Sequence, residues 1–245
     1  MMFQIAAATA MAIKKGTSAS FPNLHSNLIL INNDTFYNFC HNTPGQPRYA
    51  EEYMSVFSTL DVSEPSKQLP TIHFPYHYED LQTPQDCWIN GFFQSEKYFM
   101  EYRDEILSQF TPPEQISDFL NSYSNILSDN TLSLHVRRGD YLKLPLHHPS
   151  PPLEYYQNAI LEMEPFDHCL VFSDDLAWCR ENFKDDRFIF VNEKDYFELF
   201  LMSKCNNHII SNSSFSWWGA WFNPNEDKKV VAPRIWVGEK IRDDT

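Results

Sequence analysis

The chain has 245 residues, of which 42% are hydrophobic and 16% aromatic, so it can bury one large core or two smaller ones. Its formal net charge of −14 and pI near 5.0 argue against general electrostatic attraction to nucleic acid or to an anionic membrane surface. Any phosphate that it binds must therefore meet a local cluster of positive charge. The five cysteines form no CxxC pair, which argues against a disulfide framework or a zinc ribbon and favours a reduced compartment.

The N-terminal segment predicts a helix rather than a secretory signal. Its apolar residues 1–11 are followed, not preceded, by Lys14 and Lys15, which reverses the order of a signal peptide. Alanine-rich sequence, lysines in the last turn and then Gly16 are typical of a helix with a glycine C-cap. Because no run of about 18 apolar residues occurs, we predict no transmembrane segment and expect a soluble, cytoplasmic protein, at most peripheral to a membrane.

The following segment, residues 17–85, is rich in proline, asparagine and serine, and predicts mostly loops with one short strand at 27–32. Two helices are predicted after it. One spans about 96–110, and the other begins at the proline pair of residues 112–113 and runs to about 127.

From residue 130 onward, short apolar strands alternate with helices. This pattern predicts βαβ units and a parallel, doubly wound sheet, in which ligands bind beyond the carboxyl ends of the strands. The predicted strands are 132–136, 169–172, 188–191, 208–210 and 229–232, and the predicted helices are about 153–164, 175–183, 194–204 and 215–222.

A first polar cluster follows the strand at 132–136. Arg137 and Arg138 carry planar forks of donors that can grip a pyrophosphate, and Asp140 can orient one of them. His135 could donate to a phosphate or a base, and the glycine at position 139 permits a tight turn. The alternative interpretation is a surface ion-pair cluster without a ligand.

Two further clusters follow neighbouring predicted strands. Asp174 and Asp175 could bind a ribose or the edge of guanine, although Asp and Ser are also the usual helix N-caps. Asn212, Ser213 and Ser214 supply polar groups at a helix start, which is a ready anion site. The three tryptophans that follow are expected in the core rather than stacked on a sugar.

Other kinds of site find little support in the sequence. There is no GxGxxG, no GxxxxGK[ST] and no GxSxG. His73 and His77 have metal-like spacing, but Pro75 between them breaks a helix face, so we expect no metal site.

The three clusters, in this order and spacing, resemble the bacterial-type α-1,2-fucosyltransferases of glycosyltransferase family 11. The resemblance implies an α/β, GT-B-like fold with two Rossmann-like domains, an acceptor-side domain over 1–128 and a GDP-fucose-binding domain over 129–245. The matching stretches are HVRRGDY at 135–141, VFSDDLAWC at 171–179 and CNNHIISNSSFSWWGAWFN at 205–223, with weaker matches at 2–12, 88–99 and 230–236.

The resemblance further implies inverting transfer of L-fucose from GDP-fucose to the 2-hydroxyl of a glycan acceptor ending in galactose, without a metal or other cofactor. By motif position, Arg137 is the expected β-phosphate ligand and leaving-group stabiliser, supported by Arg138 and Asp140, and Arg138 is the alternative for the decisive phosphate contact. The implied donor-binding residues are His135, Asp174, Asp175, Asn212, Ser213 and Ser214.

The sequence departs from the family pattern at its start. The family normally opens with a strand and a Gly-rich GNQ-type turn directly before the MFQ of its first helix, whereas here MFQ stands at residues 2–4. We therefore expect the N-terminal domain to lack its first strand and Gly-rich loop. Two other classes of function stay open on that expectation: a catalytically inactive GDP-sugar-binding relative, and a non-catalytic lectin-like or structural module.

Overall fold

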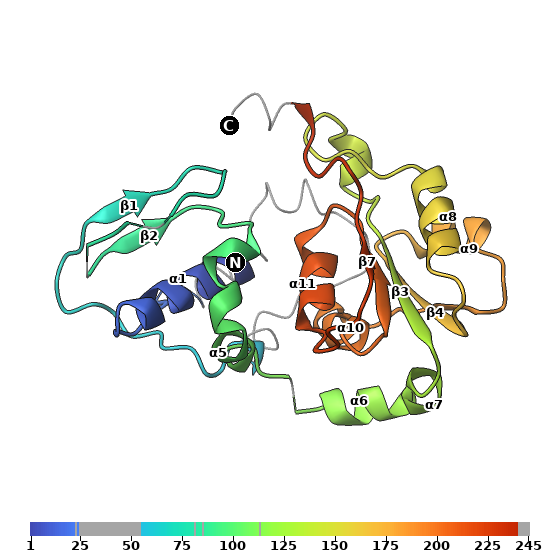
Figure 1. Ribbon diagram of the computed structural model, residues 1–245, viewed down its shortest axis with the longest axis horizontal. Helices are drawn as coiled ribbons and strands as arrows, with labels where there is room; N and C mark the ends of the chain where they lie inside the picture. The colour runs from blue at the N-terminus through green and yellow to red at the C-terminus, as the bar shows by residue number, and fades with distance from the viewer. Residues whose placement is uncertain (23, 25–54, 81, 85, 113, 240–245) are drawn as a thin grey trace. The chain divides into compact units, whose positions relative to one another are not determined.

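The computed structural model describes residues 1–22, 24, 55–80, 82–84, 86–112 and 114–239 (Figure 1). The strand predicted at 27–32 lies outside these residues. The described residues divide into two compact units, one ending at Thr111 and the other beginning at Pro112. Within the described part of the chain, no helix is both long enough and apolar enough to cross a membrane.

The first unit opens with the predicted helix, α1 (Met2–Lys14). Alanine has the highest helix propensity, and the small side chains let one face of α1 pack closely into the unit, where Ile5 is buried. The helix ends as expected, because Gly16 adopts a positive φ of 65° that side-chain-bearing residues rarely accept.

A two-stranded parallel sheet, β1 (Thr71–His73) and β2 (Trp88–Asn90), completes this unit with short helical turns. We predicted neither of these strands. The single helix predicted at 96–110 is instead three pieces, because Phe99 turns into the core with a non-helical φ of −147° and interrupts it. The three pieces are the 3₁₀ turns η1 (Glu96–Tyr98) and η2 (Met100–Tyr102) and the helix α5 (Arg103–Ser108).

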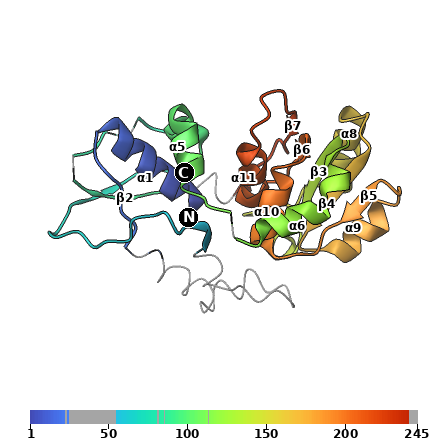
Figure 2. The same ribbon diagram turned by 90° about the horizontal axis from the view of Figure 1, so that it is seen from below.

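The second unit is built on a five-stranded sheet in which every strand is parallel to its neighbours, with the order β5-β4-β3-β6-β7 (Figure 2). The central strand is buried along its whole length, as expected of a parallel sheet covered on both faces. The five predicted strands are confirmed: β3 (Thr131–Val136), β4 (His168–Ser173), β5 (Phe188–Phe190), β6 (Asn207–Ile209) and β7 (Val230–Val231).

Helices cover both faces of this sheet (Figure 2). Successive residues of β4 point to opposite faces, so Val171 joins the core cluster that includes α8 and α9, whereas Phe172 joins the one that includes α10. All four helices were predicted: α8 (Leu153–Glu162), α9 (Leu176–Asn182), α10 (Asp195–Met202) and α11 (Ser214–Phe222).

Helix α11 contacts α10, and the two helices approach closely at Gly219. A Cβ added there would clash with the side chain of Met202, so only glycine fits between the helices. Trp218 and Trp221 are buried in this layer, which confirms their predicted place in the core, while Trp217 is only half-buried.

The helices α6 (Ile116–Ser122) and α7 (Ser124–Leu127) belong to the second unit. Phe119 and Tyr123 pack against the core cluster that includes α10, so the contacts divide the chain near residue 112 and not at 128, where we had placed the boundary. The two α/β units, each with a parallel sheet, confirm the predicted GT-B-like fold class.

Candidate active site

The second sheet has a topological switch point between its neighbouring strands β3 and β6. From β3 the chain crosses to β4 on one side, and from β6 it crosses to β7 on the other side. In open parallel sheets, ligands bind in the crevice that such a reversal opens beyond the carboxyl ends of the strands. The three predicted clusters all begin at this edge of the sheet, directly after β3, β4 and β6.

Arg137 is held by two carboxylates. Its Nη2 lies 2.8 Å from Oδ1 of Asp140, and its Nε lies 3.2 Å from Oδ2 of Asp174. The register of the sheet, which pairs Val136 with Ser173, brings the second of these residues alongside the arginine. The side chain is 19% exposed, and neither ion pair uses Nη1. The guanidinium is therefore fixed in orientation and retains donors for a ligand.

Arg138 is held by the two aspartates that follow β4. Its backbone N–H donates to Oδ1 of Asp174 at 2.9 Å, and its Nε pairs with Oδ2 of Asp175 at 3.1 Å. Its guanidinium carbon lies 4.2 Å from the ring centroid of Trp178, within cation–π distance. Asp175 also caps α9, because its Oδ1 accepts from the backbone N–H of Trp178 at 3.1 Å.

Gly139 allows this close arrangement. A Cβ at that position would lie 2.7 Å from Oδ2 of Asp174, which is shorter than a real Cβ contact. Glycine is needed here for the space beside the carboxylate, because its φ is not positive.

Tyr141 joins the arginine cluster to the third cluster. Its ring centroid lies 5.5 Å from the guanidinium carbon of Arg137, and its hydroxyl donates to the carbonyl of Asn212 at 2.9 Å. The side-chain amide of Asn212 in turn donates to the carbonyls of Pro149 and Trp236, at 3.0 Å each. The three clusters thus meet in one region and do not point into separate parts of the unit.

His135 is buried at the end of β3 and carries no charge at neutral pH. Burial, assisted by the positive charge of Arg137, lowers the pKa of the imidazole to about 3. Its Nδ1 lies 3.0 Å from the hydroxyl oxygen of Ser211, and its ring lies beside that of Phe215. A contact between this neutral ring and a nucleotide stays a prediction.

The start of α11 supplies the remaining predicted residues. Ser213 is the N-cap, and its hydroxyl accepts from the backbone N–H of Phe215 at 3.3 Å. Ser214 is exposed in the first turn. The first N–H groups of a helix and its dipole together favour an anion, so the end of α11 at this sheet edge is suited to phosphate oxygens.

The residues that the structure describes contain no group of three or more His, Cys, Asp or Glu side chains that could hold a metal ion. Burial raises the pKa of the thiols of Cys169, Cys179 and Cys205, so all three are protonated and unsuited to act as nucleophiles.

We did not predict Tyr141 or Trp178 as site residues. Both lie inside the motifs HVRRGDY and VFSDDLAWC, so their positions were visible in the sequence. Their contacts depend on the spatial arrangement: Trp178 reaches Arg138 only because a helix begins at Leu176, and Tyr141 reaches Asn212 across 71 positions of sequence.

The family model described as Glycosyl transferase family 11 matches residues 74–241, which is more than half of the chain. The chain belongs to this family. The resemblance seen in the three motifs is thereby confirmed.

The chain is also similar to three curated proteins. An O-antigen biosynthesis glycosyltransferase, WbnK, of Escherichia coli is 38% identical over 172 residues, covering 64% of this chain and 57% of the relative. An α-1,2-colitosyltransferase of Escherichia coli is 35% identical over 159 residues, covering 60% and 54%. Galactoside α-(1,2)-fucosyltransferase 1 of Bos taurus is 30% identical over 169 residues, covering 59% and 45%. This chain spans about half the length of the curated relatives it matches.

Among solved structures, POFUT1 in complex with GDP-fucose matches with a TM-score of 0.45 at 12% identity, over 60% of this chain and 54% of that one.

Proposed function

We propose that this protein is an inverting glycosyltransferase that moves L-fucose from GDP-fucose to the 2-hydroxyl of a galactose-terminated glycan. The observation that carries the proposal is the fixed guanidinium of Arg137, which Asp140 and Asp174 hold at the switch point of the second sheet. The names of two relatives support transfer of a sugar through an α-1,2 linkage.

The chemistry assigned to Arg137 follows from the charges that develop during transfer. Breaking the bond between fucose and phosphate leaves positive charge on the sugar and adds negative charge to the β-phosphate of GDP. A guanidinium that is already oriented stabilises this phosphate without reorganising, and removal of such a donor typically costs a factor of about 10²–10³ in rate. Its Nη1, which neither ion pair uses, is the donor that we assign to the β-phosphate.

The start of α11 is assigned to the other side of the diphosphate. Ser213 and Ser214 add hydroxyls and N–H groups at the positive end of the helix dipole. Arg138 adds a second positive charge, held by Asp175 and by the ring of Trp178. Because these groups can together neutralise a diphosphate, we propose that the reaction needs no metal ion and no other cofactor.

The sugar that is transferred is a separate part of the proposal. One relative is named for colitose and another for fucose, and both names give the α-1,2 linkage. We choose fucose because the sequence motifs resemble the fucosyltransferases of the family. Nucleotide-activated colitose is the competing donor, and the same assay can include it.

A transfer assay tests the proposal. The protein is incubated with GDP-fucose and N-acetyllactosamine, and the product is examined by mass spectrometry and NMR. We expect α-linked fucose on O2 of galactose, with the same yield when excess chelator is present. A chelator that abolishes turnover would overturn the metal-independent mechanism, and the lack of any fucosylated product would overturn the assignment as an active fucosyltransferase.

A further inference from the structure

The first unit carries a cluster of aromatic rings at the carboxyl ends of β1 and β2. The ring of Tyr76 lies 5.4 Å from that of Phe92, and the ring of Tyr78 lies 4.8 Å from that of Tyr98. Large parts of this cluster are open to solvent, since Phe92 is 57% and Tyr78 43% exposed. Each of these two exposed rings lies beside a half-buried ring, and exposed apolar surface of this kind can mark a binding site.

The backbone is strained at the residue that follows the exposed Phe92. The next residue, Phe93, has a φ of 53°, a conformation that is a genuine outlier for an aromatic side chain. Phe93 is buried between Phe74 and Tyr98, with ring centroids 5.4 Å away in each case. The turn therefore buries one ring and presents its neighbour to solvent. Strain of this kind is retained mainly where a particular side-chain placement is needed for function.

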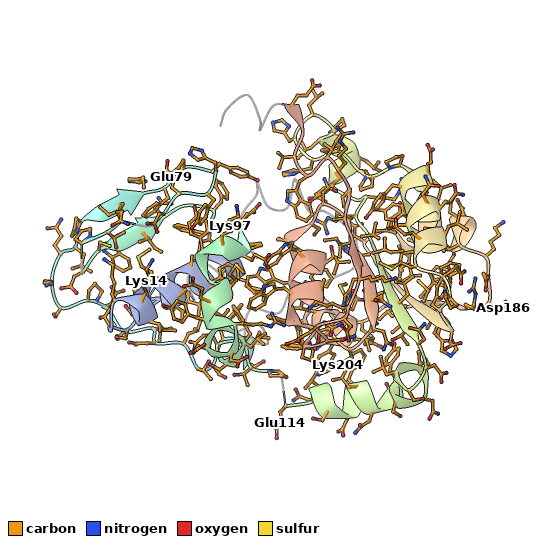
Figure 3. All side chains as sticks on the ribbon, in the orientation of Figure 1. Lys14, Glu79, Lys97, Glu114, Asp186 and Lys204 are labelled. Carbon is orange, nitrogen blue, oxygen red and sulfur yellow. The ribbon has the colours of Figure 1, made fainter. Side chains whose placement is uncertain are left out.

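Polar side chains surround the exposed rings. The hydroxyl of Tyr76 donates to Oε1 of Gln94 at 3.2 Å, and Nε2 of His77 lies 3.2 Å from Oε1 of Glu79. The ammonium of Lys97 lies 5.5 Å from the ring centroid of Tyr78. All four of these polar residues are exposed, and Figure 3 labels Glu79 and Lys97. Rings and hydrogen-bonding groups thus alternate over a short stretch of surface.

This combination fits a sugar better than a lipid or a protein core. One face of a pyranose ring such as galactose presents C–H groups, which pack against the electron-rich face of an aromatic ring, while its hydroxyls need donors and acceptors at the edge. A membrane surface would call for basic residues, but the rim holds both signs of charge, with Glu79 beside His77 and the ammonium of Lys97 over the ring of Tyr78.

We propose that Tyr76, Tyr78 and Phe92, with Gln94 and the His77–Glu79 pair at the rim, form a subsite that binds a pyranose ring of the acceptor glycan. The inference rests on the proposed function for its choice of ligand. It goes further by naming residues of the first unit, in which none of the donor-site residues of the proposal lies.

The variant Phe92→Ala tests this subsite, with Met100→Ala as the matched control because Met100 is 55% exposed in the same unit. In the transfer assay we expect Phe92→Ala to raise the KM for N-acetyllactosamine at least tenfold, and to leave the KM for GDP-fucose unchanged. Met100→Ala should change neither constant. An acceptor KM that shifts no more in Phe92→Ala than in Met100→Ala would overturn the proposal.

Two further measurements separate this proposal from a folding defect and from failure of the proposed function. Phe92→Tyr keeps an aromatic face, so it should restore the acceptor KM; a KM as high as that of Phe92→Ala would contradict stacking. Saturation-transfer NMR with methyl β-D-galactopyranoside detects sugar binding without any turnover. Sugar binding that is present in the parent protein and lost in Phe92→Ala would support the subsite even if no fucose is transferred. Fucose transfer with the same acceptor KM in the parent and in Phe92→Ala would overturn the subsite and leave the proposed function intact.

Discussion

Asp174 lies beside Arg137, with its Oδ2 atom 3.2 Å from the arginine Nε, while its other oxygen accepts the backbone N–H of Arg138 at 2.9 Å. One carboxylate at the end of β4 thus holds both the side chain of one arginine and the backbone of the next, at the end of β3. One of its oxygens accepts a backbone hydrogen bond and the other is ion-paired with the guanidinium, so the structure favours Asp174 as a residue that positions Arg137. Its expected contact with the nucleotide stays a prediction.

The variant Asp174→Asn should lower kcat about tenfold, because the neutral amide no longer pairs with Nε and the guanidinium loses its fixed direction. The KM for GDP-fucose should change less than kcat, since the positive charge of Arg137 remains. Asp185→Asn is the matched control, because Asp185 pairs with Arg187 just before β5 and contacts none of the donor-site residues of the proposal. Steady-state kinetics of both variants would decide the point, and equal kcat values for the two would argue against a positioning role.

Gly139→Ala should lower kcat by a similar factor, because the new methyl group would lie 2.7 Å from Oδ2 of Asp174 and must displace that carboxylate. A double-mutant cycle provides the check. If both substitutions act through the same contact, the double variant Gly139→Ala/Asp174→Asn should be no slower than the slower single variant. Multiplicative losses in kcat would show that Gly139 acts through something other than Asp174.

The pH dependence of stability should reveal Glu198 on α10. Burial, with smaller contributions from Asp195 and Glu193, raises the pKa of this carboxyl group from 4.5 to about 8. The folded protein therefore keeps a proton that the unfolded chain releases, so this group lowers the free energy of unfolding as pH rises from about 4.5 to about 8.

Glu198→Gln removes this dependence while an amide oxygen can still accept the 3.0 Å hydrogen bond from the backbone N–H of Glu193. The variant should be more stable than the parent by an amount that grows toward pH 8, up to a few kcal/mol at about 1.4 kcal/mol per pKa unit. Thermal melts at pH 5 and pH 8 measure it. A gain in Tm that is the same at both pH values would mean that Glu198 is ionised in the folded protein.

The strands and helices of the second unit could be predicted because each apolar stretch is bounded by a polar turn. Leu132, Cys169 and Ile209 all lie in short apolar stretches of this kind, which are typical of strands in a parallel sheet that is covered on both faces. All three side chains are buried in the structure. The first unit is different. Its strand β1 (Thr71–His73) has three residues between two prolines, which is too short for any periodicity to show.

The members of the candidate site could be predicted, but their pairing could not. Strand ends show that Arg137 and Asp174 share an edge of the sheet, yet their contact depends on the register that pairs Val136 with Ser173. No feature of the separate strands gives that register. The strained turn at Phe93 is equally hidden, because a positive φ at phenylalanine follows from the packing around it and from no local preference.

The most direct test of the proposed donor site is calorimetric titration with GDP. The parent protein should bind GDP, and Arg137→Ala should weaken binding by about two orders of magnitude, because a fixed positive charge is lost from the diphosphate site. Arg187→Ala is the control, since Arg187 also pairs with two carboxylates but precedes β5, at the opposite edge of the sheet. Loss of GDP affinity in Arg137→Ala alone is the predicted result, and unchanged affinity in that variant would contradict the account.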